Sequence, residues 1–434
     1  MSTTTINLTG VQPLMVQNWS AIEVPSAFNH PLAPFLIRRP VNSTAKLLNY
    51  DNSTFRKKLD TPIVKYVDQI NGVDTNTGDS WAQAYKSFTK LRTVSFDRAY
   101  IAKGNYATVT SSILFTSENE IISVGGISNV CYGVLGNERI WTSVGGGTFS
   151  NVLTANITVV LDTDKFDQNG NPFRLTKMSS LATVQATPDS WWKDTATNTL
   201  YVHYADGLTP SRDSSMLAIS NSIVTAGFNV YRENLNFICG IVTGNNTATP
   251  TTLNCKNCSF LFNSTTNGLS VSGNVIFFFD KCRASSNFLD GFNYHDLGAY
   301  NPYGIEINCE GSYNGEGNVS SINNGTTIHE DSFILRIGGI YHHNAGPNIH
   351  DVNNAKSLNI DCVAYSSTAS IAGNRSNFAI GALVSENCIM WLDGCVTHNE
   401  NNVFGAEDRS GLGNIFTRNT NIFNIEAGTT LTPY

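Results

Sequence analysis

The chain has 434 residues and a formal net charge of −7, and only 14% of its residues are charged, against roughly 25% in an average soluble domain. Hydrophobic residues make up 41%, enough for a packed core rather than wholesale disorder. Clusters of Lys and Arg are missing, and apolar runs stay well below the ~18 residues of a membrane span, so we expect neither nucleic-acid binding nor membrane insertion.

Residues 1–60 differ in pattern from everything that follows. The opening stretch, Met1 to Thr9, has neither a basic nor an apolar region, so we expect no Sec-type signal peptide. Prolines are spread through the segment, and it matches no later repeat. We expect an N-terminal arm used for attachment or oligomerisation. A flexible leader is the alternative.

Residues 61–92 predict a strand followed by a capping helix. The strand is expected at Val64 to Val67. Apolar residues then recur at helical spacing, behind an N-cap at Asp79 or Ser80. They are Trp81, Ala84, Tyr85, Phe88 and Leu91. Because the end of a repeat protein exposes apolar core, this amphipathic helix is expected to cover it.

Residues 93–417 predict a repeat domain whose early part is blurred. The segments 157–161 and 217–220 have the composition of strands and are taken as early rungs. An inserted hairpin is expected near 186–205, with its turn near Ala196. Residues 418–434 are expected to be a C-terminal tail.

Two columns of residues reveal the repeat between Leu253 and Glu407. The first column recurs every 23 to 33 residues, at Cys258, Cys282, Cys309, Gly339, Cys362 and Cys395. Five positions further on stand Asn263, Asn287, Asn314, Asn344, Ser367 and Glu400. Small buried thiols would fill a narrow interior, and stacked amides would bond along the axis at a turn. We therefore expect buried thiols rather than disulfides among the nine Cys.

A third column carries charge at strand ends. Strand alternation points Val271, Tyr294, Ile328 and Ile349 inward. The following residues, His295, His329 and His350, then point outward, beside Asp296, Glu330 and Asp351. The three columns together predict an all-β fold, a right-handed single-stranded parallel β-helix, since parallel crossovers are right-handed.

Two motifs resemble a known family. The segment from Tyr66 through Asn71-Gly-Val-Asp-Thr-Asn-Thr-Gly78 to Lys86 resembles the opening of pectate-lyase-like right-handed β-helix proteins, and Trp191 to His203 resembles an insert of the same group. The C-terminal rungs resemble bacteriophage tailspikes and bacterial polysaccharide depolymerases. The Arg and Asp signatures of pectate lyases proper are not found, which counts against lyase chemistry.

The resemblance implies a function and a setting. It implies a tailspike or receptor-binding protein of a virion that binds and depolymerises a bacterial capsule or O-antigen. It also implies a homotrimer that contacts other tail proteins through residues 1–60. A virion protein is released by lysis, which agrees with the absence of a signal peptide. No cofactor is expected.

The charged column offers the chemistry of glycosidic bond hydrolysis. Equivalent residues on adjacent rungs lie ~4.8 Å apart, so Asp296, Glu330 and Asp351 would be about 5 or about 10 Å apart, which suits the two carboxyls of a glycosidase. The His column could tune their pKa values or bind sugar hydroxyls. The segments 310–316 and 366–374 would wall a groove around the column.

Further candidates complete the predicted site. Tyr300, Tyr303 and Tyr313 could stack on sugar rings. Asp290, Glu306, Glu310 and Asp331 are second-line acids, with Glu306 expected to pair with Arg336. No metal is expected, because imidazoles one rung apart lack a compact tetrahedral spacing. A polysaccharide lyase and a non-enzymatic adhesin or virion structural protein remain the alternatives, and a solvated structural ladder would explain the column without function.

Overall fold

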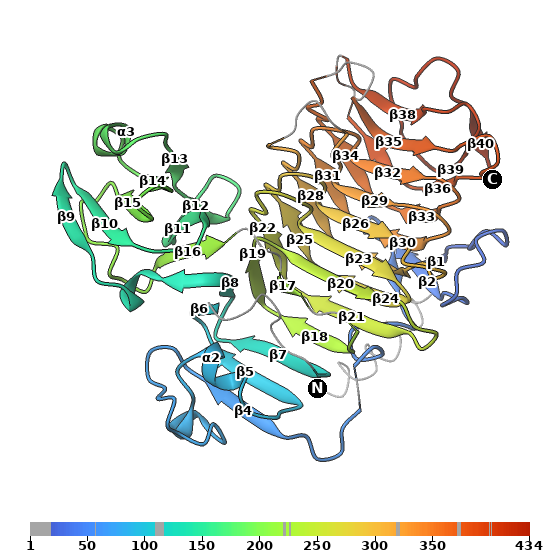
Figure 1. Cartoon of the computed structure of the whole chain (residues 1–434). Coiled ribbons are helices and arrows are strands. Elements are labelled where there is room, and N and C mark those ends of the chain that lie inside the picture. Colours follow the sequence, from blue (N-terminus) through green and yellow to red (C-terminus); the bar gives the residue numbers. More distant parts are fainter. Residues whose placement is uncertain are drawn as a thin grey trace, which may run out of the picture.

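A computed structural model describes residues 19–56, 58–108, 117–219, 223–224, 227–317, 322–370, 375–398, 400 and 402–434. The described chain is a parallel β-helix whose rungs stack from β4 to β40 (Figure 1). Each full rung contributes one short strand to each of three parallel sheets, as the sequence columns predict. Among the described residues, no helix is both long and apolar enough to cross a membrane.

Sheet I contains the strands that precede the predicted acid column. Its strands are β17 (Ile223–Val224), β20 (Ile241–Asn245), β23 (Leu269–Gly273), β26 (Phe292–His295), β29 (Thr326–Ile328), β32 (Ile349–Val352), β35 (Ser376–Gly381) and β38 (Phe404–Asp408).

Sheet II follows sheet I along the chain and has twelve strands in the described part of the chain, all of which pair parallel. Its strands are β4 (Val64–Val67), β5 (Arg98–Ala102), β7 (Asn119–Val124), β18 (Val230–Glu233), β21 (Thr251–Lys256), β24 (Val275–Asp280), β27 (Tyr303–Ile307), β30 (Phe333–Ile337), β33 (Lys356–Ile360), β36 (Ile389–Asp393), β39 (Asn414–Arg418) and β40 (Leu431–Pro433).

Sheet III begins directly after the cysteine column. Its parallel strands are β6 (Asn105–Thr108), β8 (Ser128–Leu135), β19 (Leu235–Ile238), β22 (Ser259–Leu261), β25 (Arg283–Ser285), β28 (Glu310–Ser312), β31 (Ile340–His342), β34 (Val363–Tyr365) and β37 (Val396–Thr397).

The two predicted interior columns are confirmed. Backbone bonds join Arg283 to Cys258 and Glu310 to Cys282, so these Cys stand one above the next. All nine Cys are buried free thiols. Asn287 Nδ2 donates to Asn314 Oδ1 at 2.9 Å, and Asn314 Nδ2 donates to Asn344 Oδ1 at 2.9 Å. The amides therefore form a bonded file at the corner between sheets III and I.

The left-handed turn at this corner falls one residue before the asparagines. Positive φ angles belong to Phe262, Ser286, Tyr313, His343 and Ser366. The asparagines stabilise the corner through their side-chain bonds rather than by adopting the left-handed conformation themselves.

An inserted unit interrupts the coil between β8 and β17 (Figure 1). Its elements are η2 (Gly136–Glu138), β9 (Thr142–Gly145), β10 (Thr148–Val152), β11 (Ile157–Phe166), β12 (Pro172–Arg174), β13 (Thr176–Lys177), α3 (Leu181–Ala186), β14 (Ser190–Asp194), β15 (Thr199–His203) and β16 (Ser215–Ile219). The hairpin β14–β15 is confirmed. The prediction that the segments 157–161 and 217–220 form early rungs was wrong, because β11 and β16 pair antiparallel within the insert.

The prediction of one continuous capping helix was wrong. The chain forms a short 3₁₀ turn, η1 (Trp81–Gln83), and a single helical turn, α2 (Phe88–Leu91), whose N-cap is Ser87. Phe88 and Leu91 are nevertheless buried in the main core, so apolar residues do close this end of the coil. The expected C-terminal tail is also part of the coil, since β40 pairs parallel with β39.

The N-terminal arm packs on the outer face of sheet II. Its strands are β1 (Trp19–Ala21), β2 (Ile37–Pro40) and β3 (Lys46–Leu47), which form a small antiparallel sheet. Phe28 and Ile37 of the arm share a core with Leu335 and Trp391. A flexible leader therefore does not describe residues 19–56, and residues 1–18 lie outside the described part of the chain.

Candidate functional site

Side chains of the predicted acid and histidine column lie together over two rungs, while their catalytic role stays a prediction. His295 ends β26 and His329 follows β29 on the next rung, and their rings stack with centroids 3.7 Å apart. Glu330 Oε2 lies 3.4 Å from His295 Nδ1 and accepts a bond from the Asp296 backbone at 3.0 Å. The column is therefore a real contact set, open to solvent at Asp296.

Ionisation within this column is uneven. Burial, followed by the nearby His295, lowers the pKa of His329 to about 4. Burial opposes the charge on Glu330, but the bonds from His295 and from the Asp296 backbone outweigh it and lower the Glu330 pKa. At neutral pH the carboxylate is thus ionised beside a neutral His329.

The predicted alignment of the third strand with the column was wrong by two residues. Ile328 pairs with Asp351, so His350 stands beside Thr327 rather than beside His329. Because side chains alternate along a strand, Asp351 points into the coil and is fully buried, and it cannot serve a surface ladder. Burial also drives the pKa of His350 well below its usual value.

Asp351 belongs to a polar network inside the coil. Arg336 lies 3.2 Å from Asp351 and 3.9 Å from Glu306, which confirms the expected Glu306–Arg336 pair. Tyr294 donates to Glu306 at 2.6 Å, and Tyr341 also bonds it. Burial disfavours the Arg336 charge, but the two carboxylates outweigh it and raise its pKa. These groups are buried and satisfy one another, so Glu306 and Asp351 are structural.

The other predicted residues are scattered. Tyr303 lies on the outer face of sheet II against His30 of the arm, with ring centroids 6.0 Å apart, so it cannot stack on a sugar there. Asp290 is buried, and burial raises its pKa to about 6. Tyr300 bridges to Leu297 in a loop, and Asp331 is exposed. Tyr303 therefore lies on another face from the column, whereas Asp290 is close enough to His295 for that histidine to lower its pKa slightly against the effect of burial.

A long cleft separates the inserted unit from the outer face of sheet III. Its largest part, about 970 Å³, lies between Asp164 and Arg212 of the insert and Arg283 of β25. A second part of about 280 Å³ reaches Tyr313 and Glu316, and a third of about 560 Å³ continues past Glu316. The second and third hollows share Arg174 and Glu316, and the first begins at Leu261, next to Phe262 of the second. Together they mark a groove that is bridged where Arg283 donates to the Asn169 carbonyl at 2.6 Å and Arg174 pairs with Glu316 at 2.6 Å.

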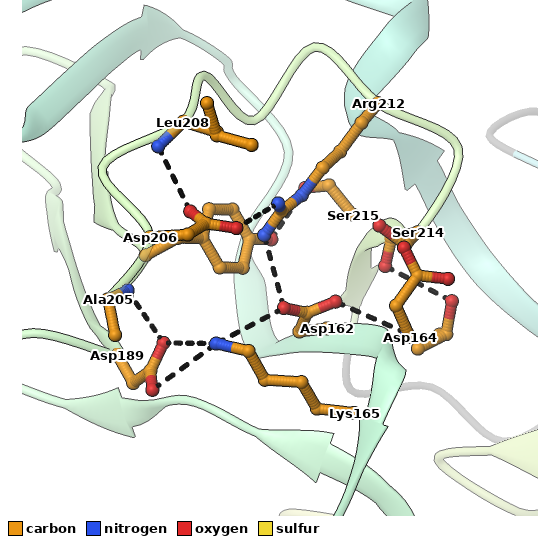
Figure 2. Close-up of polar contacts among 12 residues, drawn as sticks. Asp162, Asp164, Lys165, Asp189, Ala205, Asp206, Leu208, Arg212, Ser214 and Ser215 are labelled. Carbon is orange, nitrogen blue, oxygen red and sulfur yellow. Dashed lines mark hydrogen bonds and ion pairs between the residues drawn. The ribbon is translucent and has the colours of Figure 1, made fainter.

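A network of charged residues holds the insert side of this groove (Figure 2). Asp162 is buried and accepts from Arg212 at 3.1 Å, while Arg212 also pairs with Asp206 at 2.6 Å. Lys165 joins Asp162 to Asp189 through contacts of 3.5 and 3.2 Å. Because each carboxylate is already paired, the network positions this wall rather than offering a free acid.

Glu310 lies on the outer face of sheet III, one rung from Arg283, which lines the groove. Arg283 lies 3.2 Å from one side of its carboxylate, and His342 Nε2 lies 3.4 Å from the same oxygen. Burial opposes ionisation, but the bonds from His342 and Ser312 and the charge of Arg283 outweigh it and hold the Glu310 pKa below its usual range. Glu310 is thus ionised at neutral pH and flanked by a histidine.

The contact continues from His342 to a second histidine. His342 Nδ1 lies 2.8 Å from His343 Nδ1, so one nitrogen donates and the other accepts. Burial, followed by His342, lowers the pKa of His343, which is therefore neutral at pH 7. Glu310, His342 and His343 form a carboxylate–imidazole–imidazole chain on the outer side of sheet III, in contact with Arg283 and Tyr313, which line the groove.

Aromatic rings extend this chain of contacts toward the C-terminus. Tyr313 stacks on His343 at 4.9 Å, His342 on Tyr365 at 4.9 Å, and Tyr365 on His398 at 4.6 Å. The sequence analysis found Tyr313 and Glu310 but missed the other rings. The position two residues before the asparagine column would have revealed His342, Tyr365 and His398.

The sequence predicted no metal site because imidazoles on adjacent rungs were expected to lie too far apart. One cluster contradicts that expectation. Ligand atoms of His295, His329 and Glu330 all lie within 4.8 Å of one another.

Comparisons with known proteins support the fold. No family model matches the sequence, and no curated protein matches it. A solved glycoside hydrolase is similar in structure, with 10% identity and a TM-score of 0.51 over 84% of this chain and 99% of that chain. A rhamnogalacturonan lyase has 14% identity and a TM-score of 0.37 over 82% and 73% of the two chains, and a pectate lyase has 12% and 0.35 over 84% and 78%. The chain thus has a parallel β-helix fold that a glycoside hydrolase shares.

Proposed function

We propose that this protein binds a polysaccharide along the groove between the inserted unit and sheet III and cleaves its glycosidic bonds there. The observation that carries the proposal is the chain of contacts from Glu310 through His342 to His343, which touches the groove residues Arg283 and Tyr313 at its two ends. Tyr313, which lines the groove and stacks on His343, supplies an aromatic surface next to this chain for a sugar ring. A glycoside hydrolase with the same fold supports the proposal.

The chain of contacts makes His343 a base. An N–H on His342 Nε2 faces the Glu310 carboxylate, so His342 Nδ1 is left to accept from His343 Nδ1. The free Nε2 lone pair of His343 then takes a proton, and the ionised Glu310 stabilises the positive charge that forms. A neutral His343 at pH 7 suits this role.

Hydrolysis is the proposed reaction. His343 takes a proton from the attacking water, whose oxygen bonds to the anomeric carbon as the glycosidic C–O bond breaks, and the Tyr313 phenol stacked on His343 gives a proton to the leaving oxygen. His343 then returns its proton to Tyr313. Glu316 lines the same hollow as Tyr313 but pairs with Arg174 at 2.6 Å, so it is not the acid. The catalytic groups thereby move from the predicted Asp296, Glu330 and Asp351 to the other side of the coil.

Elimination is a second candidate, favoured by one contact. The Tyr313 ring stacks on the neutral His343, which places a phenol beside a base. Such a pair could remove a proton from carbon and return one to the leaving oxygen.

The finer proposal is a tailspike-type depolymerase. In this proposal the glycan is a bacterial capsule or O-antigen, the protein acts from a virion tail as a homotrimer, and other tail proteins contact the N-terminal arm. The resemblance of the C-terminal rungs to tailspikes supports it. Negative-stain images and the mass of the purified particle test the trimer.

The activity test uses purified capsules and lipopolysaccharides from a panel of bacteria. We expect new reducing ends with at least one of them. Ultraviolet absorbance of an unsaturated product would assign elimination instead of hydrolysis. Specific binding without any cleavage would favour a non-enzymatic adhesin and contradict the enzymatic part of the proposal.

Single substitutions locate the site. Glu310→Gln and His343→Gln should each slow cleavage by about 10²–10⁴-fold, because each removes part of the proton transfer. Glu233→Gln is the matched control, since Glu233 also pairs with a cation on the next rung, Lys256 at 3.0 Å, but on sheet II. If Asp296→Asn and Glu330→Gln abolish cleavage while Glu310→Gln does not, the predicted ladder is the site and the groove is not.

A further inference from the structure

A second cluster lies on sheet I, away from the groove on sheet III. Two imidazoles and a carboxylate meet there, from His295, His329 and Glu330. The arrangement arises from the coil itself, because parallel strands of adjacent rungs lie about 4.8 Å apart and stack equivalent residues. Glu330 has a left-handed backbone, with φ of 51°, which turns its carboxylate back toward His295.

We propose that His295, His329 and Glu330 bind a divalent transition-metal ion of the zinc class. Imidazole and carboxylate donors are the set that zinc and its neighbours accept, and three protein donors leave one position for water. The donor atoms lie within 4.8 Å of one another. Metal–ligand bonds of about 2.0–2.2 Å bring donors to roughly 3.3–3.5 Å apart, so only a small closure is needed.

The side chains can make that closure. The His295 side chain is 42% exposed, so rotation about its Cβ–Cγ bond meets little resistance from the core. The two rings now stack with an interplanar angle of 20°, and fanning them apart would direct a lone pair of each toward one ion. The Glu330 contact of 3.4 Å to His295 Nδ1 is replaced by a shared ion.

A neighbouring histidine points independently to a ligand on this face. His350, on the next rung, is only 7% exposed, and its Nε2 has no hydrogen-bond partner among the described residues. This nitrogen lies 3.8 Å from where a Cβ of Gly381 would stand, and Gly381 follows Val352 on the outward file of His295 and His329. Because Val352 separates Gly381 from His329, this nitrogen is not one of the three donors, and it would meet the ion only through bound water.

The consequence would be a clamp between two rungs. An ion held by residues of adjacent coils ties β26 to the end of β29, so it stabilises the folded chain in proportion to its occupancy. The clamp does not depend on the proposed groove chemistry, because none of its residues lines the groove.

The test is metal titration of untagged, full-length protein. Calorimetry with Zn²⁺ should show one ion per chain, Co²⁺ should give the visible absorption of a tetrahedral or five-coordinate site, and the melting temperature should rise with either ion. His295→Ala and Glu330→Gln should each weaken binding roughly tenfold or more.

The matched control is His398→Ala. His398 lies 3.9 Å from Glu400, so it forms a histidine–carboxylate pair that lacks a second aligned imidazole. Loss of the His398 imidazole should leave the affinity for Zn²⁺ and Co²⁺ unchanged. Failure of wild-type protein to bind either ion would overturn the proposal. So would binding that persists at full strength in both cluster variants, which would place the ion elsewhere.

Discussion

The outer faces of sheets II and III share one backbone geometry and carry opposite surfaces. On sheet II the outward file is apolar, with Phe278, Ile305, Leu335, Leu358 and Trp391 on successive rungs, and the N-terminal arm covers it. On sheet III the outward positions hold Arg283, Glu310, His342 and Tyr365, and the inserted unit leaves a groove that Arg283 lines. Coil geometry therefore sets where side chains point, and the outward residues decide whether a face is covered or open.

The largest expected effect is a difference in the free energy of unfolding between substitutions on the covered face and on the open face. Trp391→Ala should lower the free energy of unfolding by about 3–5 kcal/mol, because Trp391 is 3% exposed and packs against Phe28 of the arm. Tyr365→Ala on the open face should change it by about 0.5 kcal/mol or less while weakening glycan binding. Chemical denaturation and binding assays on both variants check this, and equal stability losses would refute the contrast.

A smaller effect is expected from pH on the covered face. His30 of the arm is 3% exposed where it packs on sheet II, and burial lowers its pKa from 6.5 to about 4. The unfolded chain binds the proton near 6.5 and the folded chain does not, so this contribution is complete above that pH and is lost as pH falls toward 4. Between pH 7 and pH 5 the loss should be about 2 kcal/mol.

His30→Gln isolates that contribution. The stability gap between wild type and variant, measured by urea unfolding, should shrink by about 2 kcal/mol from pH 7 to pH 5. Other buried histidines take up protons equally in both proteins, so their contributions to the stability gap cancel. A gap independent of pH would mean that the imidazole is not buried as neutral.

The smallest expected effect lies at the edge of the covered face. Arg39 of the arm pairs with Asp361 at 2.6 Å and with Asp393 at 3.2 Å. Arg39→Ala should cost about 1 kcal/mol at low salt, because the pairs are partly solvated. The cost should decrease in high salt, and unfolding curves at two ionic strengths measure it. A cost that salt does not change would assign the loss to packing instead.

The sequence predicted the coil because its interior files contact copies of themselves. Cys258 lies against Cys282, and Asn287 bonds Asn314, so repetition in sequence corresponds directly to contact in space. The insert lacked that signal. The segment 157–161 has the composition of a strand, but composition does not tell whether the partner is parallel or antiparallel.

The site was only partly predictable for a related reason. Placing Asp351 outward assumed that the interior is apolar. The coil instead accommodates Asp351 because Arg336 of sheet II reaches it at 3.2 Å across the interior. Two sheets must be aligned together before that charge can be placed. Glu310 was found only as a second-line acid, since its value depends on His342 on the next rung and on an insert that the sequence did not resolve.

The nine buried thiols make the protein its own reporter of local opening. They are distributed from Cys131 near the first rungs to Cys395 near the last, and burial raises the pKa of thiols such as Cys282 and Cys395. An alkylating reagent can react with each only when its rung separates from its neighbours. Mass spectrometry of labelled peptides would then give an opening rate for each rung, and show from which end the coil frays.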